Sequence, residues 1–257
     1  MPGIQFAAPF PIIRLEGVDH NHLARVMRAK PGDEVIVLNN AGETAVATVE
    51  RTEKSFTLLE IASIVLPESV GIAPEPTVQI VVAQALGKAD KLETVIQHGA
   101  EAGATEFVPV RADRCVADLP TDPGRAAEKL LRWNQISKSA AEQACLLRIP
   151  KVQAPLPSRH LFSAFGPEGM LRLILHPGPA GEPLRHALET VSRAPASIVI
   201  AIGPEGGWSP AELETAAASG WRMITLGPRV LRTETAALVA ISQITYRFEQ
   251  VQIQQRG

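Results

Sequence analysis

The stretch Ile200-Ala-Ile-Gly-Pro-Glu-Gly-Gly-Trp-Ser-Pro-Ala-Glu212 combines the end of an apolar run, a glycine-rich loop and a helix start. The run Ser197 to Ile202 is short and apolar, as expected for a buried strand. Ser209 can cap a helix, Pro210 suits its first position, and Glu212 can complete a capping box. A buried strand followed by a capped helix is typical of α/β proteins.

Further strands and helices are expected on both sides of this stretch. Four runs are short and apolar enough for a sheet that is covered on both faces: Val78 to Leu86, Phe107 to Val110, Leu171 to Leu175 and Met223 to Leu226. A helix is predicted from about Asp90, with Glu93 completing a capping box. Two more run from Ser209 to Gly220 and from about Glu234. Apolar positions at helical spacing are Leu92, Val95, Ile96 and Gly99 on the first helix, and Leu238, Ile241, Ile244 or Thr245, Phe248 and Val251 on the last.

The segment Leu66 to Pro76 holds three prolines between two strand-like runs and is typical of an interdomain linker. We therefore expect a smaller domain over residues 1–70 and a larger α/β domain over 71–257. Strand candidates in the smaller domain are Ile12 to Leu15, Val35 to Leu38, Ala45 to Val49 and Phe56 to Ile64. This pattern predicts a small β-barrel. One helix is expected within it, capped by Asp19, with Leu23, Val26 and Met27 on its apolar side.

Three glycine-containing loops follow predicted strands: His176 to Pro179, Gly203 to Trp208 and Gly227 to Thr233. Ligands of parallel α/β sheets bind at the carboxyl ends of the strands, and glycine lets a flat ring approach the main chain. We expect the loops to share one sheet edge, although tight turns alone would also explain their composition. No GxxxxGK[ST], GxGxxG or GxSxG motif occurs, which excludes the common ATP, dinucleotide and serine-hydrolase sites.

Composition predicts a globular protein that stays in the cytoplasm. The 257 residues are 46% hydrophobic and 20% charged, and we expect neither a membrane span nor a secretory signal. Cys115 and Cys145 lack the spacing of metal ligands and are expected to be buried or partly buried thiols. His20 and His22 would lie on different faces of a helix, so no metal site is expected.

Two C-terminal motifs carry a family resemblance. Ile200 to Ser209, together with Leu226-Gly-Pro-Arg-Val-Leu-Arg-Thr-Glu-Thr-Ala236, resembles the signature of the knotted SPOUT methyltransferases and, more narrowly, of the RsmE family. The resemblance covers most of the chain, because it extends to Gln84–Lys91, Gln97–Gly103, Trp133–Gln143 and His22–Val35. The chain departs from the family at Ile4-Gln5-Phe6, where relatives usually have an arginine before two aromatic residues.

The resemblance implies a fold and an activity. RsmE enzymes use S-adenosylmethionine to methylate N3 of one uridine in 16S ribosomal RNA of the small subunit, as part of ribosome maturation. Their fold is an α/β methyltransferase domain with a deep trefoil knot, preceded by a smaller PUA-like β-barrel. The family also implies a homodimer with two active sites near the interface.

By resemblance, S-adenosylmethionine would lie across the three loops and be held by main-chain groups. The expected contacts are Leu175, His176, Ile202, Gly203, Gly207, Leu226, Gly227, Val230, Leu231 and Arg232. For Leu226 and Leu231, ordinary core packing is the alternative. Methyl transfer from a sulfonium is an in-line displacement, so the enzyme must mainly align donor and acceptor, and no metal is needed.

Uracil N3 carries a proton that must leave, so a proton acceptor or a cation is required. Arg232 could stabilise charge on the uracil oxygens, and Glu205 or Glu234 could accept the proton or orient the group that does. Each glutamate also has a structural alternative. Glu234 suits the start of a helix because of the helix dipole, and Glu205 could brace the Gly203 loop.

The formal net charge of −2 gives little support for RNA binding. Residues 14 to 30 nevertheless have a local surplus of two positive charges. We expect the first domain to bind RNA phosphates through Arg25, Arg28 and Lys30, with a solvated helix face as the alternative. Residues that would extend this track are Arg111, Arg114, Arg125, Lys129 and Arg132.

Two other functions stay open at this point. A related knotted enzyme could methylate the ribose 2′-oxygen of tRNA, although the barrel and the string Leu231 to Thr235 favour the uridine-N3 family. A noncatalytic ribosome-assembly factor would bind the same RNA. The intact glycine loops disfavour that reading, and cofactor binding would separate the two.

Overall fold

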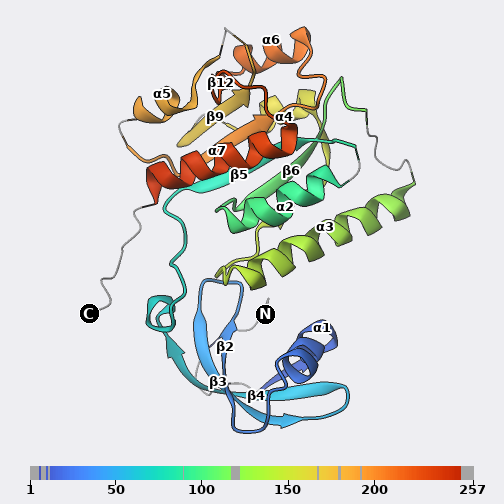
Figure 1. The fold of residues 1–257 in the computed structure, drawn as a ribbon, viewed down its shortest axis with the longest axis vertical. Coiled ribbons are helices and arrows are strands. Elements are labelled where there is room, and N and C mark those ends of the chain that lie inside the picture. The colour runs from blue at the N-terminus through green and yellow to red at the C-terminus, as the bar shows by residue number, and fades with distance from the viewer. Residues whose placement is uncertain are drawn as a thin grey trace. The chain divides into compact units, whose positions relative to one another are not determined.

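The computed structural model describes residues 6, 10, 12–88, 90–116, 122–166, 168–178, 181–191 and 193–249 (Figure 1). The chain divides into two compact units. Unit 1 comprises Met1–Glu75 and Cys145–Arg148, and unit 2 comprises Pro76–Ala144 and Ile149–Gly257. The chain thus passes from the first unit to the second within the predicted linker Leu66 to Pro76.

Unit 1 is built on a four-stranded antiparallel sheet with the order β1-β4-β3-β2. Its elements are β1 (Ile12–Glu16), α1 (Gly17–Asn21), the π-helix η1 (His22–Val26), β2 (Glu34–Leu38), β3 (Thr44–Thr52), β4 (Phe56–Val65) and the 3-10 helix η2 (Pro67–Val70). Side chains alternate between the faces, so β1 buries Ile13 and Leu15 and exposes Arg14. All four predicted strands are present. Among the described strands no ladder joins β1 to β2, so the predicted barrel is observed as a four-stranded sheet.

The helix after β1 differs from its prediction at its start and on its buried face. Asp19 lies inside α1 and does not cap it. Leu23 is buried as expected, but Val26 and Met27 are 70% and 60% exposed. The reason is the π-helical turn, in which Met27 N donates to His22 O at 3.0 Å, five residues back. That wider turn rotates the two side chains away from the face of Leu23.

Unit 2 is built on an eight-stranded sheet in which every pairing is parallel. Its strands are β5 (Gln79–Ala85), β6 (Glu106–Arg111), β7 (Lys151–Val152), β8 (Leu156–Pro157), β9 (Met170–Leu175), β10 (Glu182–Pro183), β11 (Ser197–Ile202) and β12 (Arg222–Thr225). Their order is β10-β12-β9-β11-β5-β6-β7, with β8 beside β6. The predicted α/β class is therefore confirmed.

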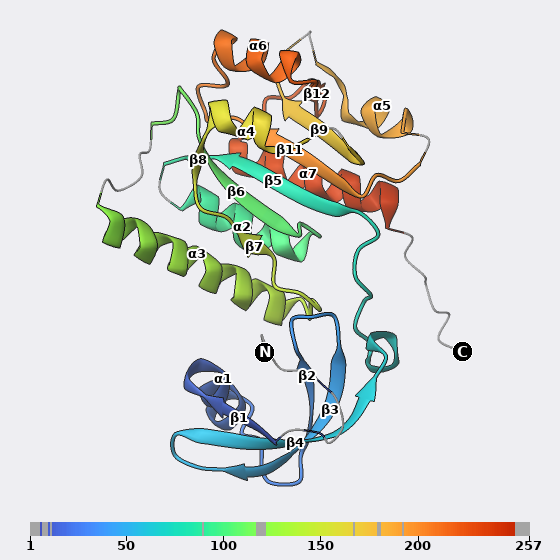
Figure 2. The same cartoon turned by 180° about the vertical axis from the view of Figure 1, so that it is seen from behind.

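Helices cover both faces of this sheet. They are α2 (Lys91–Glu101), α3 (Pro123–Gln143), α4 (Ser158–Ala164), α5 (Leu184–Glu189), α6 (Pro210–Ala218) and α7 (Thr233–Phe248). Two opposite views place α2 and α7 on one face and α4 and α6 on the other (Figure 1 and Figure 2). α3 packs on α2, and α5 lies next to β12.

Alternating strand residues form a core on each face of the sheet. Towards α4 and α6, the packed side chains include Val81, Val108, Ile174, Val199, Phe162, Trp208 and Trp221. On the other face, Gly99 allows α2 to approach the sheet closely. A Cβ at Gly99 would lie 2.9 Å from the ring of Phe107 and 3.2 Å from Ile241 of α7. Glycine at this position therefore permits the close packing of α2, β6 and α7.

Of the two predicted capping boxes, one is confirmed and one is wrong. The Ser209 side chain accepts from Glu212 N, and the Glu212 side chain accepts from Ser209 N. Asp90 instead has φ −92° and ψ 19°, so its backbone is not extended and its side chain does not cap α2. Glu93 binds the Arg132 guanidinium at 2.7 Å. Val251, expected on the last helix, lies outside the described residues.

Three smaller expectations can be compared with the structure. Cys115 is half-buried as predicted, but Cys145 is exposed, because it follows the end of α3 with a left-handed φ of 53°. His20 is buried and hydrogen-bonded to Thr57. The described residues contain no group of three or more His, Cys, Asp or Glu that could hold a metal ion. Within the described ranges, no helix is long and apolar enough to cross a membrane.

Candidate active site

The loops that follow β9, β11 and β12 lie together at one edge of the sheet. These strands are neighbours, and Leu175 at the end of β9 is level with both Ile202 of β11 and Ile224 of β12. Because all three strands are parallel, their carboxyl ends meet at the same edge. The predicted shared edge is therefore confirmed for the described loop residues. Pro179 lies outside them.

Two glycines and Trp208 shape the loop after β11. A Cβ at Gly203 would lie 3.1 Å from Nε1 of the Trp208 indole, so a side chain there would crowd the ring. Gly207 has φ 68°, and its N–H donates to the carbonyl of Pro204 at 2.8 Å, which closes a tight turn. Trp208 is buried and packs edge-on against Phe162, which fixes the loop to the core.

The loop after β12 exposes both main chain and side chains. Gly227 has φ 115°, a conformation that other residues rarely adopt. Val230 is 87% exposed although it is apolar. Arg232 has an extended backbone and immediately precedes α7. Its side chain is exposed and forms no hydrogen bond or ion pair with the rest of the described chain, so it is available to a ligand at this edge.

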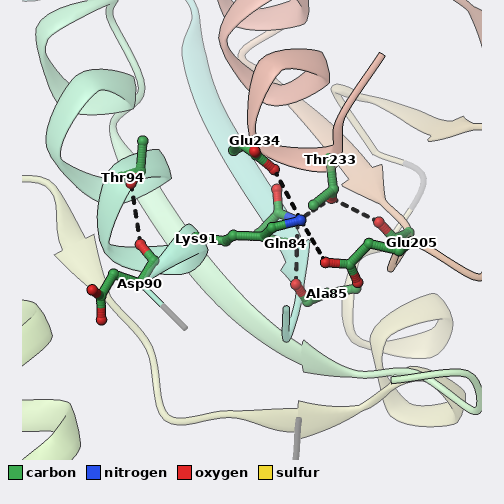
Figure 3. A network of polar contacts seen from close by, with 9 residues as sticks. Gln84, Ala85, Asp90, Lys91, Thr94, Glu205, Thr233 and Glu234 are labelled. Atoms are coloured by element: carbon green, nitrogen blue, oxygen red, sulfur yellow. Dashed lines mark hydrogen bonds and ion pairs between the residues drawn. The ribbon is translucent and has the colours of Figure 1, made fainter. Parts of the chain in front are cut away.

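A buried chain of hydrogen bonds joins three segments at the same edge (Figure 3). The Gln84 amide at the end of β5 donates to the Thr233 hydroxyl at 2.8 Å, and that hydroxyl donates to the carbonyl of Gly203 at 2.8 Å. Both Gln84 and Thr233 are buried. This chain therefore fixes β5, the loop after β11 and the first turn of α7 to one another.

A charged group lies beside that chain (Figure 3). Nζ of Lys91, the first residue of α2, lies 2.6 Å from Oε1 of Glu205 and 3.5 Å from Oε2 of Glu234. The hydrogen bond from Lys91 lowers the pKa of the Glu205 carboxyl, and the same bond raises the pKa of Lys91. Lys91 and Glu205 are therefore both charged at neutral pH.

A fourth loop, after β6, is tied to the loop after β11. The Arg114 guanidinium donates to the carbonyl of Gly206 at 3.1 Å. Ser209 Oγ donates to Oδ2 of Asp113 at 2.6 Å, and Asp113 N donates to Oε1 of Glu212 at 3.0 Å. These bonds brace the start of α6 and the loop before it from the side of β6.

Buried polar atoms without a hydrogen-bond partner gather at this edge. In the described part of unit 2 they are Oε1 of Gln84, Nε1 of Trp208 and Oε2 of Glu234, whose contact with Lys91 is a long ion pair. Each belongs to a segment that ends or begins at the edge. Since a buried polar atom without a partner is costly, their grouping indicates a site for a polar ligand.

Comparison with known proteins gives this site a family. Residues 73–245 match the model of an RNA methyltransferase domain, and residues 15–61 match that of an RNA methyltransferase PUA domain. Ribosomal RNA small subunit methyltransferase E of Bacillus subtilis is 32% identical over 93% of this chain and 91% of its own length. This chain belongs to the RsmE family. The family resemblance inferred from the two C-terminal motifs is thereby confirmed.

Solved structures of similar proteins agree with this RsmE assignment. A methyltransferase from Legionella pneumophila, in complex with S-adenosylmethionine, has a TM-score of 0.80 and 30% identity, with 92% of each chain covered. The ribosomal RNA small subunit methyltransferase E from Neisseria gonorrhoeae, also bound to S-adenosylmethionine, has a TM-score of 0.79 and 28% identity. The alignment of the two structures covers 92% of this chain and 92% of the Neisseria chain.

The cofactor contacts expected from the RsmE resemblance belong to the three loops at the sheet edge. Ile202 is 1% exposed, so only its main chain can contact a ligand. Leu226 and Leu231 are half-buried, which leaves both core packing and ligand contact open for them. Of the expected catalytic residues, the structure brings Glu205 and Glu234 together through Lys91. The roles of all these residues stay predictions.

The expected RNA-binding residues fall in both units. Arg25, Arg28 and Lys30 are exposed in unit 1, and Arg28 has a left-handed φ of 56°. Arg111 and Arg114 belong to unit 2, where Arg114 is already bonded to the loop after β11. Two of the residues expected to extend the track have partners within the chain: Lys129 lies 5.4 Å from the centre of the Trp133 ring, and Arg132 pairs with Glu93.

Three residues of the RsmE-type site were not singled out from the sequence. Gln84, Lys91 and Thr233 lie inside segments that carry the family resemblance, but no role was assigned to them. A signal was available for Gln84, because an amide within the apolar strand Val78 to Leu86 must have a partner when it is buried. No comparable local signal marks Lys91, whose partner Glu205 is 114 residues away.

Proposed function

We propose that this chain transfers the methyl group of S-adenosylmethionine to N3 of one uridine in 16S ribosomal RNA. The observation that carries the proposal is the meeting of glycine loops, two carboxylates and a free guanidinium at one sheet edge of an RsmE-family chain. The glycine loops suit a nucleoside cofactor, and a carboxylate can act as the proton acceptor.

The residues at this edge fit the cofactor. Gly227 has open space beside its Cα, which leaves its main chain open to a flat ring, and unpaired buried atoms of Gln84 and Trp208 offer one acceptor and one donor. The residues proposed to hold the cofactor are Leu175, His176, Ile202, Gly203, Gly207, Leu226, Gly227, Val230, Leu231 and Arg232. When bound, S-adenosylmethionine would supply an electrophilic methyl group without help from a metal ion.

The chain itself must align the base and take up its N3 proton. Glu234 is the proposed acceptor, because its Oε2 is buried and accepts no hydrogen bond. Arg232 is proposed to stabilise negative charge on the uracil oxygens, since its guanidinium is exposed and unpaired two residues before Glu234. N3 lies on the pairing edge of the base, so the uridine must be unpaired or turned out of its stack.

Binding of the RNA and assembly of the enzyme are parts of the same proposal. Arg25, Arg28, Lys30, Arg111 and Arg114 would bind phosphates of the small-subunit RNA. The homodimer and the trefoil knot are both proposed from the family resemblance. Since the substrate is ribosomal RNA, we place the reaction in the cytoplasm.

Single-turnover kinetics on small ribosomal subunits that lack this methylation test the assigned roles. Glu234→Gln should slow methyl transfer by about 10²-fold or more, the usual effect of losing a general base. Arg232→Ala should slow it by a similar factor of about 10². Glu214→Gln is the matched control, because Glu214 is exposed on α6, and it should react at the wild-type rate.

Calorimetric titration with S-adenosylmethionine separates catalysis from binding in these variants. Glu234→Gln should bind the cofactor as the wild type does. Wild-type turnover in both Glu234→Gln and Arg232→Ala would remove the two roles from the proposal.

A further inference from the structure

We infer that Lys91 is a positioning residue for this methyl transfer: its ammonium group holds Glu205 and Glu234 together as anions, fixes Glu205, and leaves Glu234 as the proton acceptor. The inference rests on the proposed function and separates the roles of the two glutamates. It depends on the geometry around a single nitrogen atom (Figure 3).

The turn between β5 and α2 places Lys91 for this role. A Cβ at Gly87 would lie 3.1 Å from Cδ of Lys91 and 3.5 Å from Oε1 of Glu205, so the glycine leaves room for this pair. The side chains of Lys91, Glu205 and Glu234 are 28%, 37% and 19% exposed, which shields the group partly from water. Three separate segments, α2, the loop after β11 and α7, meet at this nitrogen.

The two glutamates are held unequally. The contact of 2.6 Å between Lys91 and Glu205 is a charge-assisted hydrogen bond, whereas 3.5 Å to Glu234 is long for one. Oε2 of Glu234 is buried and accepts no hydrogen bond. Glu205 is therefore the tightly paired carboxylate, and Glu234 is held only by a long ion pair through its Oε2.

Other charged or titratable groups around this site are less well placed. They are Lys88 in the turn before α2, Arg114 and Cys115 after β6, and Arg232 before α7. Lys88 also lowers the pKa of Glu205, but less than Lys91 does. Lys91 is the dominant cation for Glu205 and the cation that forms an ion pair with Glu234 in the described chain.

The charges balance through the transfer step. As the N3–H bond breaks, the carboxylate of Glu234 takes the proton, and the N3 electron pair bonds to the methyl carbon while that carbon's bond to sulfur breaks onto sulfur. Glu234 becomes neutral, and Lys91 and Glu205 remain a neutral ion pair. Without Lys91, the two carboxylates would have no shared counter-ion, and Glu205 would lose the hydrogen bond that fixes it.

The test compares the pH dependence of single-turnover methyl transfer by the full-length wild type and by Lys91→Met, Lys91→Arg and Lys138→Met. In Lys91→Met we expect the acid limb of the profile to move upwards by about one pH unit or more, because a nearby cation lowers carboxyl pKa values by that much. Lys91→Arg should keep the wild-type profile. Lys138→Met is the control, because Lys138 is an ion-paired lysine of similar exposure, on α3.

An activity that is lower in Lys91→Met by the same factor at every pH would overturn the inference, since a merely structural lysine gives that result. A second measurement does not need turnover. Carbon-13 NMR of glutamate-labelled protein follows the carboxyl titration of Glu205 without RNA or cofactor. Because the hydrogen bond from Lys91 lowers the pKa of Glu205, this carboxyl should titrate at higher pH in Lys91→Met than in the wild type, and an unchanged titration would also overturn the inference.

The two measurements separate this inference from the proposed function. If the wild-type chain made no 3-methyluridine, the proposed function would fail. The NMR titration of Glu205 would then still decide whether Lys91 holds that carboxyl as an anion.

Discussion

At the scale of single residues, one hydroxyl group connects most of the candidate site. Thr233 accepts a hydrogen bond from Gln84 and donates one to the carbonyl of Gly203. These partners are 149 and 30 residues away in the sequence. The hydroxyl therefore satisfies a buried amide and a loop carbonyl that only the fold brings together.

Thr233→Val keeps the shape of this side chain and removes both hydrogen bonds. We expect a loss of about 1–3 kcal/mol in the free energy of unfolding, because one N–H of the buried Gln84 amide and the Gly203 carbonyl lose their partner, while the bond from Gln84 to the Ala85 carbonyl remains. Thr233→Ser keeps the hydroxyl and should lose at most about 0.8 kcal/mol, the value of one buried methylene group. Urea unfolding measures both variants. Equal stability of the Val and Ser variants would contradict the hydrogen-bond account.

At the scale of elements, the sequence was predictive wherever one short segment contains everything that a feature needs. The capping box of Ser209 and Glu212 is present because both partners and the proline between them are local. Asp90 and Glu93 have the same spacing, but a capping residue also needs an extended backbone. In the turn after β5 the backbone of Asp90 is not extended, so its side chain does not cap α2. The shared edge of the three loops was predictable, because neighbouring parallel strands end on the same side.

Contacts between elements could not be predicted in the same way. The pairing of Lys91 with Glu205 depends on the contact between the start of α2 and the loop after β11. The spacing of apolar residues in the sequence carries no information about that contact. The exposure of Val26 and Met27 depends on a single π-helical turn, which changes the helical period on which the prediction rested. Both features follow from packing and backbone geometry rather than from local propensity.

The contact between β10 and β12 predicts a pH dependence of stability. Nε of Arg222 donates to Glu182 at 2.8 Å, and this bond lowers the pKa of the Glu182 carboxyl. A carboxyl whose pKa is lower in the folded state stabilises the protein above its unfolded pKa and loses this effect as the pH falls through the folded value. Glu182→Gln should therefore be less stable than the wild type at neutral pH by roughly 1 kcal/mol or less, since both side chains are partly exposed.

Urea unfolding of Glu182→Gln at pH 7 and in acid checks this sign. The stability difference from the wild type should shrink as the pH falls below the ordinary carboxyl pKa of 4.5 and through the lower pKa of the folded state. Glu189→Gln is the control, because Glu189 forms only an exposed pair with Arg185 and should change stability by less than about 0.5 kcal/mol. A difference that stayed constant over this pH range would contradict the role of the Arg222 bond.

At the scale of the whole molecule, the two units are proposed to supply different parts of one reaction. Unit 2 holds the three glycine-containing loops and the two glutamates, and unit 1 exposes Arg25, Arg28 and Lys30. The net charge of −2 means that any affinity for RNA must come from local groups of cations. The knot and the dimer stay predictions, because both were inferred from the family resemblance.

The local-charge account predicts the salt dependence of RNA binding. Replacing Arg25, Arg28 and Lys30 together by alanine should weaken RNA binding. It should also reduce the steepness of the plot of log binding constant against log salt concentration by about 2, because each contact with a phosphate of single-stranded RNA contributes roughly 0.7. Fluorescence anisotropy with a small-subunit RNA fragment measures the slope. Arg132→Ala should leave it unchanged, because Arg132 pairs with Glu93. An unchanged slope in the triple variant would remove these residues from the RNA interface.

The central claim is methyl transfer to N3 of a uridine in 16S ribosomal RNA. In its most direct test, the full-length protein and labelled S-adenosylmethionine are incubated with small ribosomal subunits from a strain that lacks this methylation. The labelled nucleoside is then identified by mass spectrometry. The account predicts labelled 3-methyluridine, with little or none in Glu234→Gln. Label on a ribose or on another base, or no label despite cofactor binding, would contradict it.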